Sequence, residues 1–174
     1  RELTPRHGIV LIYDEVITGF RLGLAGAQGR LGIKPDLSIF AKGIGGGFPV
    51  AAMGGRADIM ALVASGKGSM AGTYSANGIA IAAANAALDE LSTPDLYAKL
   101  DAVSDELRLG LGKILRDAGL PAYVVGLGPL MQVWFAKEPI HNYRDAERHA
   151  DQELFRKWWQ GMLARGVLFH PGAY

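Results

Sequence analysis

The chain has 174 residues, 49% of them apolar, and its 18 Lys and Arg residues nearly balance its 17 Asp and Glu residues to leave a net charge of +1. This composition supports one domain or two small ones with a sizeable core, excludes a disordered tail, and gives no electrostatic reason to expect nucleic acid or an anionic membrane as a partner. The absence of cysteine excludes a disulfide framework, a thiolate-bound metal and a cysteine nucleophile, and it is compatible with a reducing cytoplasm, where we expect the protein to work.

The first half of the chain contains three candidate strands. Residues 8–13 (GIVLIY) form an apolar run that is followed at once by Asp14, which favours a strand buried on both faces of a parallel sheet. A second run, residues 36–41, ends at Lys42, and residues 48–53 form a third strand, parallel or antiparallel. Because ligands gather at the carboxyl ends of strands in α/β sheets, Asp14 and Lys42 both occupy positions where chemistry is expected.

Helices and one hairpin account for the rest of the chain. Helices are predicted at residues 56–65, 75–91, 95–118 and 145–165, and a β-hairpin is predicted within residues 123–135. The longest apolar stretch, residues 78–88, is shorter than the roughly 18 residues that a membrane span needs. The first part therefore resembles an α/β domain and the second an α+β domain, with a boundary near residues 92–94.

Glycine is unusually frequent, at 24 residues, or about twice its usual share. Several glycines cluster at residues 43–47, directly after Lys42, where they allow the backbone to turn sharply. A phosphate-binding loop of the Walker type requires the lysine after the glycines, and no dinucleotide-binding glycine fingerprint follows a strand. A nucleotide-binding α/β module is therefore the least supported alternative.

Asp14 and Lys42, each taken alone, allow a structural and a functional interpretation. A carboxylate at a strand end is explained by an N-cap, by a surface salt bridge or by a cation that faces it. A lysine before a glycine turn either points into solvent or, in a polar cleft, supplies a nucleophilic amine that forms Schiff bases with carbonyl groups. For each residue alone, the structural interpretation is favoured.

Three segments, in order, resemble the class III pyridoxal-phosphate-dependent aminotransferases. Residues 13–21 (YDEVITGFR) are similar to the Asp-Glu-Val segment of that family, residues 35–49 (PDLSIFAKGIGGGFP) to its Schiff-base lysine segment, and residues 72–77 (GTYSAN) to a third motif. The resemblance covers nearly the whole chain. The Gly-Phe-Arg ending of the first motif, with Ile17 where many members carry Gln, is most similar to the glutamate-1-semialdehyde 2,1-aminomutase branch.

The resemblance implies an α/β fold of the PLP-dependent transferase type (fold type I). Residues 1–92 would be the C-terminal part of the PLP-binding large domain, and residues 93–174 a smaller, truncated α+β domain. Lys42 would form the internal aldimine with pyridoxal 5′-phosphate (PLP) and move a proton during catalysis. Asp14 would pair with the pyridine nitrogen, and Val16 would pack against the ring.

The resemblance also implies partners and a reaction class. Thr73 would hydrogen-bond the cofactor phosphate from the neighbouring subunit, which implies a homodimer with shared active sites. The substrate would be a small amino acid or oxo acid, and the reaction an amino-group transfer by a transaminase or an aminomutase. Glu15 receives no role from the resemblance.

The sequence also predicts what the chain lacks. It starts at Arg1 without Met or a signal-peptide pattern, and residues 166–171 look like a strand and turn cut off at Tyr174. We therefore expect the middle or later part of a longer protein, without the phosphate loop and the stacking aromatic of the family. The alternative function is a catalytically incomplete fragment that acts only as a folding or dimerisation module.

Histidines and tryptophans give no further site. No metal is expected, because the histidines lack metal-ligand spacing; they are His7, His141, His149 and His170. The tryptophans are expected in the core or at an interface; they are Trp134, Trp158 and Trp159.

Overall fold

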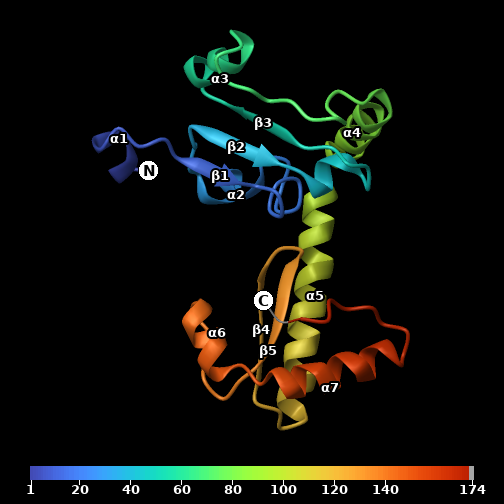
Figure 1. The fold of residues 1–174 in the computed structure, drawn as a ribbon. Coiled ribbons are helices and arrows are strands. Elements are labelled where there is room, and N and C mark those ends of the chain that lie inside the picture. Colours follow the sequence, from blue (N-terminus) through green and yellow to red (C-terminus); the bar gives the residue numbers. More distant parts are fainter. Residues whose placement is uncertain (173–174) are drawn as a thin grey trace. The chain divides into compact units, whose positions relative to one another are not determined.

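The computed structural model describes residues 1–172 and contains two compact units that divide between Tyr97 and Ala98 (Figure 1). The division falls slightly after the expected boundary near residues 92–94. Tyr97, the last residue of the first unit, donates a hydrogen bond of 3.3 Å from its hydroxyl to the carbonyl oxygen of Phe20 in the same unit.

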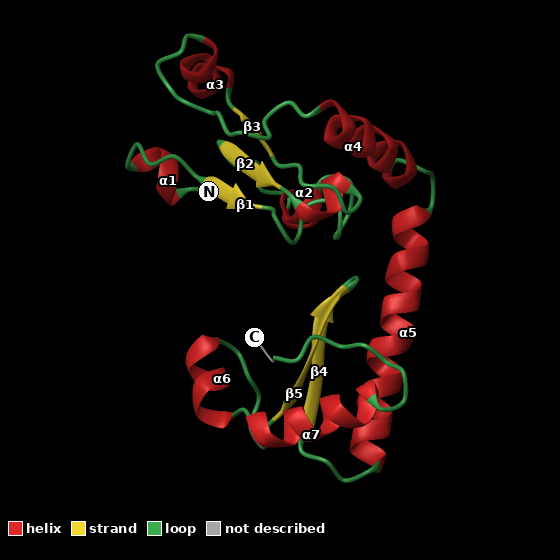
Figure 2. Ribbon diagram, turned by 45° about the vertical axis from the view of Figure 1, so that its right-hand side comes forward, coloured by secondary structure: helices red, strands yellow, loops and turns green. Residues whose placement is uncertain are grey.

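The first unit is built on a three-stranded sheet with the order β1-β2-β3. Strand β1 (Ile12–Asp14) runs parallel to β2 (Leu37–Phe40), and β3 (Ala52–Gly55) runs antiparallel to β2. The register places Asp14 opposite Ile39. Figure 2 shows these strands as the central yellow arrows of the first unit. The three expected strands therefore form one sheet.

The expectation that residues 8–13 form a strand buried on both faces is wrong. Only Ile12–Asp14 adopt strand structure, and Ile9, Val10 and Ile12 are all exposed. Within the described residues, β1 is an edge strand whose one hydrogen-bonded neighbour is β2. An apolar run indicates a tendency toward burial, but a strand is buried only where other helices or strands pack on its faces.

Short helices connect the strands of the first unit. They are α1 (Leu3–Arg6), α2 (Gly26–Leu31), the 3₁₀ helix η1 (Lys42–Gly45), α3 (Ala57–Ala64) and α4 (Gly78–Leu91). Helix α4 starts later than the predicted residue 75 because Asn77 is its N-cap, with Oδ1 accepting hydrogen bonds of 3.1 Å from the backbone N–H groups of Ile79 and Ala80. Helix α4 packs beside η1, which carries Lys42.

The second unit combines a long helix, a hairpin and two further helices. These elements are α5 (Leu96–Asp117, which begins in the first unit), β4 (Ala122–Leu127), β5 (Leu130–Phe135), α6 (Tyr143–His149) and α7 (Gln152–Leu163). Strands β4 and β5 pair antiparallel around Gly128, which has a positive φ of 53°. The predicted long helix and hairpin are confirmed.

Two predictions for the end of the chain are wrong. The single helix expected at residues 145–165 is two helices, because Ala150 is extended and Asp151 caps α7 by accepting a hydrogen bond of 2.8 Å from Leu154 N. Asp151 N also donates to Phe135 O on β5 at 2.7 Å. The strand expected at residues 166–171 is absent from the described residues, and Tyr174 lies outside them.

The core of the second unit is aromatic and aliphatic. Its buried residues are Leu115, Val133, Phe135 and Phe155, with Trp158 and Trp159 packed against them. The ring of Trp158 lies 5.9 Å from that of Phe135, and Trp134 is also buried. The tryptophans were expected in the core or at an interface: Trp134 is buried, and Trp158 and Trp159 are partly buried against the core.

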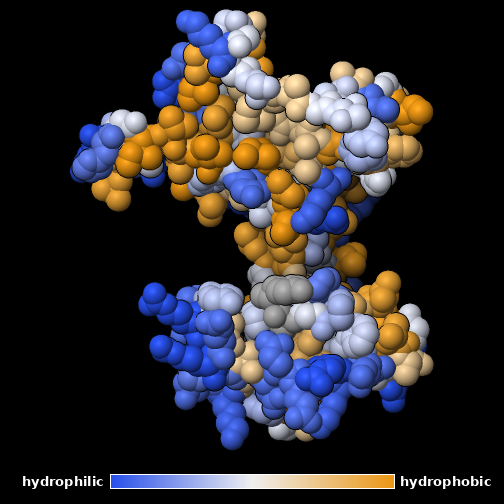
Figure 3. Space-filling view, viewed as in Figure 1, coloured by the Kyte–Doolittle hydropathy of each residue, from blue (hydrophilic) through white to orange (hydrophobic). Residues whose placement is uncertain are grey.

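The surface differs between the units on the face that Figure 3 shows. Apolar side chains cover much of the first unit around its strands, whereas hydrophilic side chains dominate the second unit around α6 and α7. In residues 1–172, no helix combines the length and the apolar character that crossing a bilayer requires.

Candidate functional site

The structure places Asp14 and Lys42 at the carboxyl ends of neighbouring parallel strands. Asp14 is the last residue of β1, and Lys42 follows β2 after Ala41 alone. Because β1 and β2 are parallel and hydrogen-bonded to each other, both residues lie at the same edge of the sheet. This edge, called the sheet edge below, is the one formed by the carboxyl ends of β1 and β2. Both side chains are exposed. A carboxylate and a primary amine are therefore presented at one edge.

Lys42 has an unusual backbone conformation. Its φ is +50°, in the left-handed region that residues other than glycine rarely adopt. Such a conformation costs on the order of 1 kcal/mol or more and is often found at functional sites. Within residues 1–172, the Lys42 ammonium has no hydrogen-bond or salt-bridge partner. The amine is therefore available to an external group.

The glycines after Lys42 let the chain turn within η1. A Cβ on Gly45 would lie 2.8 Å from Val50 Cγ1, and Gly46 ends η1 with a φ of +55°. Side chains at these positions would clash with Val50 or strain the backbone. The glycine run thus shapes the turn that follows Lys42, as its position in the sequence indicates.

Asp14 has a single local hydrogen bond. Its Oδ1 accepts from the backbone N–H of the half-buried Val16 at 3.0 Å. Within the described residues Asp14 forms no salt bridge, so a surface ion pair does not explain it. The carboxylate keeps acceptor positions free for a donor outside the chain.

Glu15, next to Asp14 at the end of β1, received no role from the sequence. Its side chain has no exposed surface. It accepts hydrogen bonds from Ala27 N at 2.9 Å, from Gln28 N at 2.8 Å and from the hydroxyl of Thr18. Glu15 therefore caps the start of α2. The sequence carries only a weak signal for this role: a Glu directly after a strand, followed three residues later by a Thr that can donate a hydrogen bond to it.

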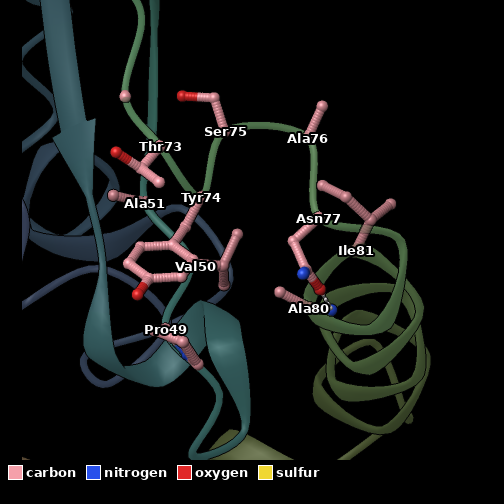
Figure 4. Close-up of a pocket in the computed structure, with 11 residues that line it drawn as sticks. Pro49, Val50, Ala51, Thr73, Tyr74, Ser75, Ala76, Asn77, Ala80 and Ile81 are labelled. Atoms are coloured by element: carbon pink, nitrogen blue, oxygen red, sulfur yellow. Dashed lines mark hydrogen bonds between the residues drawn. The ribbon is translucent and has the colours of Figure 1, made fainter.

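Thr73 lies in a different part of the first unit. It is exposed and lines a cavity of about 320 Å³, which Figure 4 shows between residues 49–51, just before β3, and the start of α4. The lining residues are Pro49, Val50, Ala51, Gly72, Thr73, Tyr74, Ser75, Ala76, Asn77, Ala80 and Ile81. Asp14, Val16 and Lys42 are not among them. The structure thus brings those three residues to one sheet edge, and Thr73 lines a cavity to which none of them contributes.

A metal centre is not built by these side chains. In the part of the chain that the structure describes, no three His, Asp or Glu residues are grouped so as to hold a metal ion. The reactive groups that the sheet edge presents are the Lys42 amine and the Asp14 carboxylate.

Comparison with known protein families identifies the family of this chain. Residues 1–172 match the family described as aminotransferase class III. The chain belongs to the class III aminotransferase family. The resemblance predicted from the three motifs is confirmed.

Curated relatives agree with this family. The chain is 43% identical to a glutamate-1-semialdehyde 2,1-aminomutase of Desulfatibacillum aliphaticivorans and 40% identical to one of Methanosarcina acetivorans, each over 175 aligned residues. Each alignment covers 100% of this chain and 41% of the relative. The chain thus spans about two fifths of the length of the curated relatives it matches.

Solved structures of this family share the fold. An omega-transaminase from Sphaerobacter thermophilus matches with a TM-score of 0.86 at 32% identity, covering 99% of this chain and 40% of that one. A β-phenylalanine aminotransferase from Variovorax paradoxus matches with a TM-score of 0.88 at 33% identity, covering 98% of this chain and 40% of that one. A structure described as a transaminase with PLP bound has a TM-score of 0.85 at 28% identity, covering 99% of this chain and 40% of that one. The α/β fold of the class III aminotransferase chain is therefore shown.

Proposed function

We propose that this chain carries the cofactor-holding lysine of a PLP-dependent enzyme that transfers an amino group to or within a small amino acid or oxo acid. The observation that carries the proposal is the pair Lys42 and Asp14 at one sheet edge, with the Lys42 amine free of partners in the described residues. The names of the curated relatives support the aminomutase form of this reaction over the transaminase form.

The side chains at the sheet edge fit PLP by their chemistry. When bound, PLP supplies an aldehyde that accepts an amine and a ring that accepts electrons from the substrate. Lys42 Nζ, a primary amine without a partner in the described residues, would hold the aldehyde and would carry a proton to and from the substrate. The exposed Asp14 carboxylate would hold the proton on the ring nitrogen, and the half-buried Val16 would pack against the ring.

The remaining assignments extend the same proposal. Residues 1–92 form the C-terminal part of a fold-type-I large domain, and residues 93–174 belong to a smaller α+β domain. The enzyme is a homodimer in which Thr73 binds the cofactor phosphate of the neighbouring subunit. Thr73 lines a cavity to which neither Asp14 nor Lys42 contributes, and this supports a role outside the site of its own chain. A cytoplasmic location is proposed on the cysteine-free composition.

The experiment that tests the proposal is borohydride trapping of PLP on the complete protein, meaning this chain with any sequence that precedes or follows it. Peptide mass mapping should find a cofactor-sized addition at Lys42. The control is Lys34→Ala, which removes an amine on a different loop and should leave the labelling unchanged. Labelling confined to other lysines, or retained in Lys42→Ala, would overturn the assignment.

A second measurement separates the two reaction forms. An aminomutase rearranges one substrate, whereas a transaminase needs an oxo acid as a separate amino acceptor. We expect conversion of glutamate 1-semialdehyde without any added oxo acid. Strict dependence on an added oxo acid would instead identify a transaminase. No observation favours the alternative in which the chain acts only as a folding or dimerisation module.

A further inference from the structure

We propose that Glu15 is a positioning residue, which holds Asp14 and Lys42 in their arrangement at the sheet edge. The inference rests on the proposed function, because it concerns the geometry of the two groups assigned to the cofactor. Glu15 itself is fully buried and touches no external ligand. Its effect would pass through the backbone of β1 and through the loop that follows.

The Glu15 carboxylate ties the end of β1 to another element. Both of its oxygens accept backbone hydrogen bonds, Oε2 from Ala27 N and Oε1 from Gln28 N, and Oε2 also accepts from the Thr18 hydroxyl. An ionised carboxylate only accepts hydrogen bonds, so it matches three donors that point at one buried place. A glutamine at this position would set an NH₂ group against one of these donors.

Burial of Glu15 determines where Asp14 points. The backbone N–H of Glu15 donates to Ile39 O at 2.8 Å, which extends the pairing of β1 with β2 beyond Asp14. Successive side chains of an extended chain point to opposite sides. With Glu15 held inside against α2, Asp14 is directed outward, and its carboxylate is the exposed one of the two.

The same loop also contacts the segment that carries Lys42. Gly19 N donates to Glu15 O at 2.8 Å, and a Cβ on Gly19 would lie 2.7 Å from Phe40 Cδ1, so the loop packs closely on the end of β2. A Cβ on Gly43 would lie 3.4 Å from Gly19 O. The loop of residues 15–19 therefore contacts the chain just before Lys42, at Phe40, and just after it, at Gly43.

A purely structural role for Glu15 is the competing explanation, and the chain offers a matched control for it. Asp36 is a second buried carboxylate, 2% exposed, which accepts a hydrogen bond of 2.8 Å from Leu11 N. It lies at the opposite, amino end of β2. Loss of either carboxylate should destabilise the first unit, but only loss of Glu15 should disturb Asp14 and Lys42.

The test compares Glu15→Gln with Asp36→Asn in the complete protein. Two quantities are measured with PLP added: the rate of borohydride trapping at Lys42, and the visible circular dichroism of the bound cofactor, which reports its fixed orientation. We expect Glu15→Gln to slow trapping at least about tenfold and to reduce the dichroism, since small misplacements of reacting groups have large effects on rate. Asp36→Asn should lower the Tm and leave both quantities within about twofold of the unaltered protein.

Thr18→Val serves as the milder variant if Glu15→Gln does not fold. It removes one hydrogen bond to Glu15 and keeps the charge, so it should move both quantities in the same direction by a smaller factor. An unchanged trapping rate and dichroism in the folded variants, or equal changes in Asp36→Asn, would overturn the inference alone. Absence of Lys42 labelling in the unaltered protein would overturn the proposed function and this inference with it.

Discussion

Asp14 and Glu15 are consecutive carboxylates with opposite environments: Glu15 has no exposed surface, and Asp14 is exposed at the end of β1. Alternation of side chains along extended backbone produces this difference. The inner carboxylate is satisfied by backbone amides of α2, and the outer one keeps free acceptor positions. Under the proposed function, one short motif supplies structural support through Glu15 and chemistry through its neighbour Asp14.

Gly26→Ala is expected to be destabilising. Gly26 has a φ of +62°, and a Cβ there would lie 2.5 Å from Glu15 Oε2, so alanine meets both backbone strain and a clash. We expect the Tm of the complete protein to fall by roughly 2 °C or more. The matched control is Gly78→Ala at the start of α4, where a Cβ has no neighbour within 4 Å, and its Tm should stay equal or rise. Equal losses in both variants would contradict the prediction.

Asp14→Ala is expected to separate activity from stability. The side chain is exposed, so the Tm should change little. Exchange of the substrate α-proton with solvent, followed by NMR, should slow by about a hundredfold or more, because an electrostatic partner of the reacting system is lost. The control Asp58→Ala removes an exposed aspartate of α3 and should leave the exchange rate unchanged. An unaltered exchange rate in Asp14→Ala would remove Asp14 from the mechanism.

Lys42→Gly and Lys42→Ala should differ in stability although both lack the amine. The left-handed backbone at position 42, with φ of +50°, disfavours alanine relative to glycine by about 1 kcal/mol. Thermal unfolding should therefore give a higher Tm for the glycine variant, and neither variant should be labelled by PLP and borohydride. A higher Tm for the alanine variant would mean that Lys42 does not hold a strained conformation.

Stability should fall in acid through Asp36. Hydrogen bonds from the Arg1 guanidinium, then from Leu11 N, hold the pKa of Asp36 well below its usual value of 3.8. Near pH 3.8 the Asp36 carboxyl therefore binds fewer protons in the folded state than in the unfolded state. The contribution of Asp36 is complete well above pH 3.8 and is lost as the pH falls below that value. The Tm of Asp36→Asn should depend less on pH between 5 and 3 than the Tm of the unaltered protein does, roughly the window in which an unfolded carboxyl titrates. An identical pH dependence in the two proteins would exclude Asp36 as a cause of the acid destabilisation.

The elements that the sequence predicted correctly are those with a local signal. Helix α5 has regular leucine spacing, and the β4–β5 hairpin surrounds Gly128. Helix α2 was missed because its sequence, GAQGRL, has two glycines and no apolar period. It is capped instead by Glu15, eleven residues before its first residue. The break between α6 and α7 was missed for a related reason, since Asp151 is also fixed by the distant Phe135.

The candidate site was predicted in part. The positions of Asp14 and Lys42 after apolar runs, together with the family motifs, were readable from the sequence. The left-handed backbone of Lys42 and the burial of Glu15 were not, because both depend on contacts between segments. The apolar run before Asp14 also overstated the burial of β1, since sequence pattern does not report which elements cover a strand.

The topology of the two sheets has a consequence for the order of folding. Strands β4 and β5 are joined by Gly128 and Pro129 alone, so their pairing closes a minimal loop and is expected within about 1–10 μs. Pairing of β1 with β2 must first bring together the ends of the whole segment from Glu15 to Asp36, at a larger entropic cost. The edge that carries Asp14 and Lys42 should therefore take shape later than the hairpin, after the chain has passed through states in which these two residues are still far apart.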